Sequence, residues 1–181
     1  MSTIARDLPH EPGVRSRYSL EELRAMACRW APVPLRMIVG FGFMAHGYAK
    51  LSRGAEAFAG VLQALGTPAP HLMSWVTIVT ELAGGAAVFV GAFVTWASIP
   101  LTVVMLVAMF TVHLRYGFSS IKLQAITSAG AKFGPPGYEC ALLYIVCMAT
   151  LVMGGAGPLA IDALWRKRLR EESTQGGTHN D

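Results

Sequence analysis

The middle of this chain is long, apolar and almost free of charge, and this feature most constrains what it can fold into. Between Val33 and Ile161 only nine residues are Lys, Arg, Asp or Glu, whereas charged residues make up about a quarter of an ordinary soluble domain. The nine are Arg36, Lys50, Arg53, Glu56, Glu81, Arg115, Lys122, Lys132 and Glu139. Such a stretch favours an integral membrane protein and argues against a soluble enzyme.

Four stretches of about twenty residues divide this middle, and each is long enough to cross a hydrocarbon core of about 30 Å. They cover approximately residues 33–51, 72–94, 97–114 and 138–157. We therefore predict an all-α fold, an integral membrane four-helix bundle built from residues 33–164. Thr95 to Ser98 is expected to form a tight turn between the second and third spans. The connections 52–71 and 115–137, rich in Gly, Pro and Ser, are expected to be longer loops.

The two ends of the chain are polar and basic. Residues 1–32 show no apolar core after a charged start, so we expect no cleaved signal peptide. Within them, Ser19 and Glu22 form a capping-box pattern that predicts a short amphipathic helix ended by Pro32. This helix is expected to lie on the membrane surface or to pack against a partner. Residues 165–181 predict a basic and then disordered tail.

The distribution of Lys and Arg predicts the direction of the spans. With an even number of spans, ten of these residues lie on the side of the two termini and five on the other side. The excess predicts that both termini are cytoplasmic. It also explains the net charge of +4 without nucleic acid, because the basic residues flank apolar runs and are not interleaved with exposed aromatic residues.

Glu81 is the clearest candidate for a functional group within the membrane. It lies near the middle of the second span, where a charge costs about 2.5–3.5 kcal/mol on insertion scales. Gly84 and Gly85 follow on the same helix face and would let another helix approach closely. The structural interpretation is a protonated or paired carboxylate that serves packing alone.

The other spans also carry titratable residues toward the outer side. His46 and Lys50 are four residues apart and so share a helix face, although Lys50 alone would be read as a side chain that snorkels to the headgroups. His113 ends the third span at the same level, and Glu139 begins the fourth. Each of the four helices therefore brings a titratable group to one side of the membrane, while Arg36 is on the cytoplasmic side.

This set of residues suits proton transfer coupled to redox chemistry, because imidazole titrates near neutral pH. A divalent metal held by His46, Glu81, His113 and Glu139 is a weaker alternative, since no closely spaced ligand motif supports it. A haem between His46 and His113 is equally weak. The absence of a C-x-x-C pair disfavours a dithiol oxidoreductase, and Cys140 is either a reactive thiol or a small buried residue.

Several segments, taken in order, resemble the DoxX family of small bacterial four-helix membrane proteins. The matching pieces are LRMIVGFGFMAHGYAKL from Leu35, LGTP from Leu65, ELAGGAAVFVG from Glu81, VHLRYGF from Val112, YECALLY from Tyr138 and GGAGPLAID from Gly154. The resemblance covers about Pro34 to Leu164 and implies a multi-pass protein of the bacterial inner membrane. It implies redox or accessory functions, because the family is named for similarity to a quinone-reactive subunit and its members are functionally diverse.

Three functions follow from this reading. In the first, the chain transfers electrons and protons between a quinone and a small extracytoplasmic reductant; Glu81 and His113 handle protons, His46 and Lys50 position the acceptor, and Glu139, Arg36 and Cys140 complete the binding site. In the second, it is a non-enzymatic accessory subunit that anchors or matures a soluble redox partner. In the third, it transports a small solute, with protomers associating to enlarge the pathway.

Overall fold

The computed structural model describes residues 19–165 and 167–168, and these are mostly helical. The α-helices are α1 (Leu20–Trp30), α2 (Pro32–Arg53), α3 (Ala55–Ala64), α4 (Pro70–Val79), α5 (Gly85–Val90), α6 (Val94–Ala108) and α7 (Glu139–Gly154). A π-helical turn, Thr80–Gly84, joins α4 to α5, and a second one, Met109–His113, extends α6 into a 3-10 turn, Leu114–Tyr116. Two strands, β1 (Leu123–Thr127) and β2 (Gly130–Phe133), form an antiparallel hairpin.

Two helices among the described residues are long and apolar enough to cross a membrane. One is the continuous helix of 21 residues from Pro70 to Val90, and the other has 23 residues from Val94 to Tyr116. These correspond to the second and third expected spans. The helix of the fourth span, α7, is apolar but shorter at 16 residues. The helix of the first, α2, has 22 residues, three of which are Lys or Arg.

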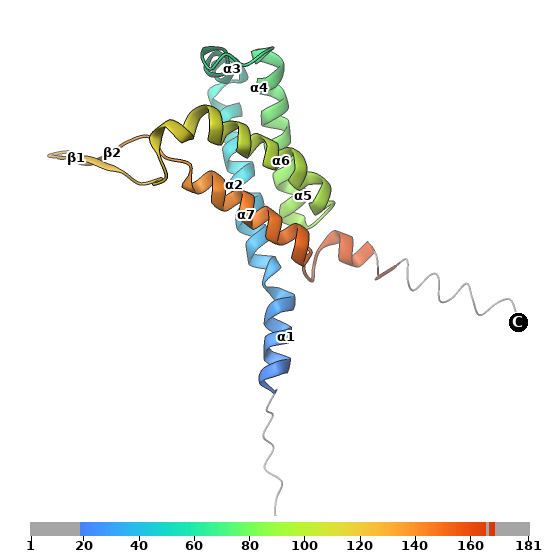
Figure 1. Ribbon diagram of the computed structural model, residues 1–181. Coiled ribbons are helices and arrows are strands. Elements are labelled where there is room, and N and C mark those ends of the chain that lie inside the picture. Colours follow the sequence, from blue (N-terminus) through green and yellow to red (C-terminus); the bar gives the residue numbers. More distant parts are fainter. Residues whose placement is uncertain (1–18, 166, 169–181) are drawn as a thin grey trace, which may run out of the picture.

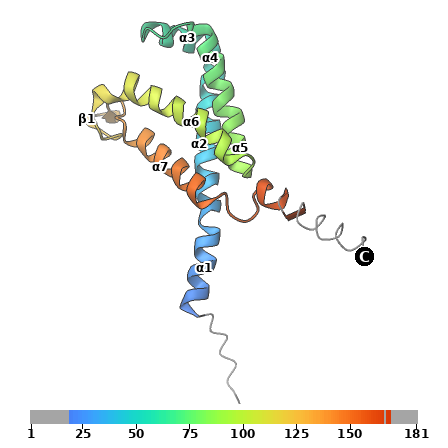
Figure 2. The same cartoon turned by 45° about the vertical axis from the view of Figure 1, so that its right-hand side comes forward.

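The helices form two crossing pairs (Figure 1). The helix α2 stands beside the continuous α4 and α5, and α6 runs beside α7. Figure 2 shows that α6 and α7 meet the first pair near the α5–α6 turn, whereas their other ends lead away toward the hairpin. The buried core occupies the meeting point and consists of Val39, Phe43, Val88, Val94, Leu101, Met148, Leu151, Ala156 and Ala160.

Glycines allow α2 and α5 to pack backbone against backbone. A Cβ atom added at Gly85 would lie 2.9 Å from both the carbonyl oxygen of Gly40 and the nitrogen of Met44, and one at Gly40 would lie 2.6 Å from the Gly85 carbonyl oxygen. Atoms of that size do not fit at such distances. The close approach expected at Gly85 is therefore confirmed, and its partner is α2.

The tight turn between the second and third spans is displaced from its expected position. Thr95 to Ser98 belong to the first turns of α6, and the turn itself consists of Gly91 to Phe93. Gly91 and Phe93 have φ of 74° and 49°. Glycine adopts this left-handed conformation without strain, whereas it is uncommon for other residues such as Phe. Asp162 holds the turn, because its Oδ1 accepts from the Phe93 backbone nitrogen at 3.0 Å and its own nitrogen donates to the Gly91 carbonyl at 3.2 Å.

Both long connections contain secondary structure that the sequence reading missed. The connection 52–71 holds the helix α3, which begins after Gly54 (φ of 95°), and its Ala-rich sequence favours a helix. The connection 115–137 holds the β1–β2 hairpin, so the expectation of a purely α-helical fold is wrong in this segment. The content of Gly, Pro and Ser predicted loops in both places, whereas the structure has a helix in the first and a hairpin in the second.

The predicted N-terminal helix is confirmed as α1. The Ser19 hydroxyl accepts from the Glu22 nitrogen at 3.2 Å, and the Glu22 carboxylate accepts from the Ser19 nitrogen at 2.9 Å, which completes the capping box. Pro32 is the first residue of α2, so only Ala31 separates the two helices. The helix α1 therefore continues in the direction of α2 beyond the other helices (Figure 1). The expected segments at residues 1–18 and 169–181 lie outside the described residues.

Candidate functional site

An ion pair between Lys50 and Glu81 joins α2 to the Pro70–Val90 helix. The Lys50 Nζ donates to Glu81 Oε1 at 2.8 Å and to Oε2 at 2.5 Å. The Glu81 side chain is 1% exposed and the Lys50 side chain 24%. Glu81 is therefore a buried, paired carboxylate, and Lys50 is partly accessible. A charge pair of this kind offsets the cost of a carboxylate at the middle of an apolar helix.

Glu81 lies in the π-helical turn Thr80–Gly84. A π-helical turn contains one residue more than the same stretch of α-helix, and such turns occur frequently at functional sites. Gly47 of α2 faces Glu81, because a Cβ at Gly47 would lie 3.1 Å from the Glu81 Cβ. The small residue lets the helix carrying Glu81 come close to α2, one turn before Lys50.

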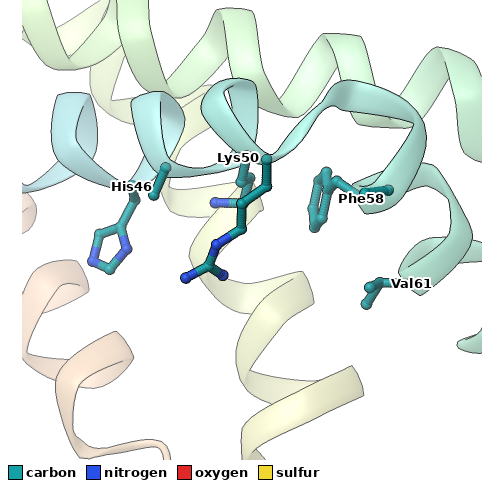
Figure 3. A pocket seen from close by; sticks show the side chains of 7 residues that line it. His46, Lys50, Phe58 and Val61 are labelled. Atoms are coloured by element: carbon teal, nitrogen blue, oxygen red, sulfur yellow. The ribbon is translucent and has the colours of Figure 1, made fainter.

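A cavity of 420 Å³ opens beside this pair, between the C-terminal part of α2 and α3 (Figure 3). Its polar wall comes from His46, Lys50 and Arg53 of α2, and Phe58 and Val61 of α3 form the apolar wall. Ala49 and Ala57 complete the lining. The Lys50 Nζ is 5.3 Å from the centre of the Phe58 ring, within the range of a cation–π contact. We call this the α2–α3 pocket.

Arg53, Phe58 and Val61 were missed by the sequence analysis. Arg53 follows Lys50 by three residues and so shares its helix face, a signal that could have identified it. Phe58 and Val61 belong to a segment that was expected to be a loop, and they could be placed on one wall only after α3 was recognised as a helix. The apolar half of the pocket therefore had no usable signal in the sequence.

His46 lies in the α2–α3 pocket one turn before Lys50. Its side chain is exposed and points toward α7 (Figure 3), where the centre of the Tyr144 ring is 6.3 Å from that of His46 in an edge-to-face arrangement. The structure thus brings together three of the residues singled out in the sequence: His46, Lys50 and Glu81.

His113, Glu139 and Cys140 lie elsewhere, at the base of the β1–β2 hairpin. The His113 Nδ1 is 3.1 Å from the Pro136 carbonyl oxygen. The Glu139 carboxylate accepts from the Ser120 nitrogen at 2.9 Å, and the Cys140 nitrogen donates to the Ser120 hydroxyl at 3.1 Å. These three residues fasten the connection between α6 and α7, with the Cys140 side chain exposed.

Arg36 is buried at the opposite end of α2. Its guanidinium donates to the Val90 carbonyl at 3.3 Å and to the Leu159 carbonyl at 3.0 Å, and its side chain is 4% exposed. The bonded carbonyls belong to the end of α5 and to the segment after α7. Arg36 therefore connects three parts of the chain and lies apart from the α2–α3 pocket.

Among the described residues, no group of three or more His, Cys, Asp or Glu side chains is close enough to hold a metal ion. The four residues considered for a metal divide between two places, because His46 and Glu81 flank Lys50 while His113 and Glu139 hold the hairpin base. The α2–α3 pocket instead combines hydrogen-bond donors with an aromatic ring, which suits an organic ligand with acceptor oxygens.

Comparison with known proteins identifies the family. The DoxX family model matches residues 31–114, which include Arg36, the Lys50–Glu81 pair and the whole α2–α3 pocket. A curated protein of Haemophilus influenzae, described as uncharacterized, is 31% identical over 136 residues that cover 74% of this chain and 90% of that protein. No solved structure matches the chain. The resemblance noted in the sequence is confirmed: the chain belongs to the DoxX family of membrane proteins.

Proposed function

We propose that this chain is a multi-pass protein of the bacterial inner membrane that transfers electrons and protons to a quinone bound in the α2–α3 pocket. The proposal rests on one observation, which is that Lys50 takes part in both the pocket and the buried ion pair. Its ammonium group lines the pocket and at the same time bonds both carboxylate oxygens of buried Glu81. A ligand in the pocket thus meets a proton donor that is backed by a buried base.

The composition of the pocket suits a quinone. Each quinone carbonyl oxygen accepts a hydrogen bond, and His46 and Lys50 both offer donors. The backbones of these two residues are one helical turn apart, about 6 Å along the helix axis. Phe58 and Val61 provide an apolar wall for the ring and for an isoprenoid tail. Many apolar side chains around the helices are exposed, which suits a ligand that arrives through the lipid.

Reduction of a quinone to a quinol takes up two electrons and two protons. In this proposal a small extracytoplasmic reductant supplies the electrons and is itself oxidised. Lys50 gives one proton to a quinone oxygen and recovers it from water on the open side of the pocket. His46, which also lines the pocket, supplies the second proton and recovers it from water in the same way. No step is assigned to His113, Glu139, Cys140 or Arg36.

The proposed topology has four spans with both termini in the cytoplasm. The excess of Lys and Arg on the side of the termini supports this direction, and α2 and α7 would complete the bundle begun by the two apolar helices. In this arrangement the α2–α3 pocket lies on the outer side, where an extracytoplasmic reductant has access.

Binding of a short-chain quinone to protein in lipid nanodiscs tests the proposal. The test variant combines Lys50→Met with Glu81→Leu, which removes both charges and leaves no unpaired partner. We expect at least about tenfold weaker binding, because a hydrogen bond to a charged donor contributes about 1.5–3 kcal/mol. Lys132→Met removes one exposed lysine outside the pocket and should bind like the wild type. Equal binding by the double variant, or no saturable binding by the wild type, would overturn the proposal.

A second candidate function is that of an accessory subunit that holds a soluble partner at the membrane. The observation that favours it is the helix α1, none of whose residues is buried among the described residues. Its apolar face includes Leu20, Leu23 and Trp30, which are 77%, 47% and 45% exposed. Because α1 extends α2 along its own direction (Figure 1), it projects from the helices and offers this face to a partner.

Two substitutions on opposite faces of α1 test the accessory function. Leu23→Glu places a charge on the apolar face, whereas Ala25→Glu places the same charge on the polar face. If α1 docks a redox partner, Leu23→Glu alone reduces the amount of partner recovered with affinity-purified membranes. Loss of function in cells from the Lys50→Met and Glu81→Leu combination, with both α1 variants active, would argue for the quinone function instead.

A further inference from the structure

The β1–β2 hairpin is held firmly at its base. Three backbone nitrogens just before and at the start of α7 donate across the base: Gly137 to Ser119 at 3.0 Å, Tyr138 to Gly117 at 3.1 Å and Glu139 to Phe118 at 3.0 Å. Together with the bonds made by His113 and by the Glu139 carboxylate, they fix the direction in which the strands leave the helices. The orientation of the hairpin relative to α6 and α7 is therefore fixed by these bonds.

A β-bulge gives this hairpin one continuous apolar face. Paired residues in an antiparallel sheet share a face, and side chains alternate along each strand. Phe133 and Ala131 lie two apart on β2, and their partners on β1 are Leu123 and Ile126. The register shift between Leu123 and Ala125 supplies the extra residue that brings Leu123 and Ile126 to the same side. We call these four residues the hairpin apolar face.

The opposite face of the hairpin is more polar. Lys132 pairs with Ala125 and Gly130 pairs with Thr127, so the Lys132 and Thr127 side chains point away from the apolar face. From Gly117 to Tyr138 the sequence contains two lysines, Lys122 and Lys132, and no Asp or Glu. The hairpin thus has an apolar side, a polar side and a positive net charge.

Nothing in the described part of the chain covers the hairpin apolar face. Leu123, Ile126 and Phe133 are 56%, 80% and 57% exposed. An isolated two-stranded hairpin has little stability in water, and exposed apolar patches mark surfaces that contact something else. The face therefore needs a partner surface.

The position of the hairpin favours a membrane surface as that partner. In Figure 1 the strands run sideways from the direction of α2, and in Figure 2 they stay at the same height and are seen almost end-on. The hairpin follows the apolar helix Val94–Tyr116 and precedes the apolar helix α7, so in a multi-pass protein it lies where the chain leaves and re-enters the membrane. Phe110 and Leu114, on the extension of α6 that precedes the hairpin, are also exposed apolar residues.

We propose that the hairpin apolar face lies in the interface of the lipid leaflet that α6 reaches at its C-terminal end, and that this leaflet contains anionic lipids. Leu123, Ile126 and Phe133 enter the boundary between headgroups and acyl chains, and Lys122 and Lys132 contact the lipid phosphates. The partner is a lipid surface because an apolar face flanked by lysines is the pattern that binds anionic interfaces. The proposal needs only the membrane location, so it stands independently of the quinone function.

Fluorescent probes on adjacent residues test the insertion. In a chain in which Ser replaces Cys28, Cys140 and Cys147, an environment-sensitive probe is attached through Ile126→Cys or, as the matched control, Thr127→Cys. In nanodiscs with one copy each and spin-labelled phosphatidylglycerol, we expect several-fold stronger quenching at position 126. Equal quenching at both positions would overturn the proposal. Quenching at position 126 that appears only in nanodiscs with two copies would also overturn it, because a second copy would then be the occupant.

The role of the lysines is tested by changing the lipid. Quenching at position 126 should be stronger in nanodiscs of phosphatidylglycerol than of phosphatidylcholine. The combination Lys122→Gln and Lys132→Gln should remove this difference, while Lys167→Gln, an exposed lysine after α7, should preserve it. Quenching that is independent of lipid charge in the unaltered hairpin would contradict the proposed contact with anionic headgroups.

Discussion

The Lys50–Glu81 pair shows how a single residue contact determines whether a polar group is tolerated within an apolar helix. Only 1% of the Glu81 side chain is exposed, so Lys50 takes the place of water as the partner of the carboxylate. Removing one partner leaves a buried charge without compensation, whereas removing both leaves an apolar contact between two helices.

Substitutions of this pair should therefore be strongly non-additive. Lys50→Met alone is expected to lower the free energy of unfolding by about 3–5 kcal/mol, and Glu81→Leu alone leaves a lysine that is still partly exposed and costs less. The double variant should recover most of the loss. Thermal unfolding of the detergent-purified proteins, followed by size-exclusion chromatography, measures the effect. Additive losses would show that the two side chains do not stabilise each other.

At the residue scale, the sequence identified candidate site residues where a charged side chain interrupts an apolar run, because such a residue costs free energy to bury. A carboxylate in an apolar run identified Glu81, and the spacing of four residues connected His46 with Lys50. It gave no information on pairing, because Lys50 and Glu81 are 31 residues apart and only the packing of two helices brings them together. For the same reason it grouped His113 and Glu139 with them, although both residues bond at the hairpin base.

At the scale of elements, the approach of α2 to α5 depends on an absence of side chains. Gly40 and Gly85 place the two backbones in contact, and small residues at such positions are typical of helix pairs in membranes. This contact positions α2 and the following turns, so that Lys50 meets Glu81 further along the same pair of helices.

The same substitution at two glycines tests this contact. Gly85→Ala is expected to destabilise the protein by about 1–3 kcal/mol, because the neighbouring atoms belong to the backbone and cannot move aside. Gly60→Ala in α3 meets no atom within 4 Å and should be neutral or stabilising by about 0.5–1 kcal/mol, as expected for alanine in a helix. Unfolding midpoints in detergent compare the two. A Gly85→Ala protein as stable as the wild type would argue against the close approach.

Long apolar helices could be predicted from the sequence by the length of their apolar runs. The turn between them and the hairpin could not, because backbone conformation and strand pairing determine them. The continuous helix from Pro70 and the one that follows it agree with the expected spans within a few residues. The turn between them was misplaced because Thr95 to Ser98 were taken as the turn, whereas α6 contains these residues and continues through Pro100. The hairpin was missed because its strands are short and its pairing contains a bulge.

At the scale of the whole molecule, the proposed topology places Cys28 and Cys140 on opposite sides of the membrane. Both thiols are exposed, one in α1 and the other at the start of α7. In intact cells with a permeable outer membrane, a membrane-impermeant maleimide should label Cys140 and not Cys28, measured in a Cys147→Ser chain. After lysis both should react. Labelling of Cys28 in intact cells would reverse the proposed orientation.

Arg36 joins parts of the chain that are made at different times. Its carbonyl partners are 54 and 123 residues later in the sequence, so α2 is synthesised before either partner. Until the segment around Leu159 is synthesised, the guanidinium lacks one of its two carbonyl acceptors. Both hydrogen bonds of Arg36 can therefore form only in a chain that extends past Leu159. The segment after α7 thus contributes to holding α2 in place.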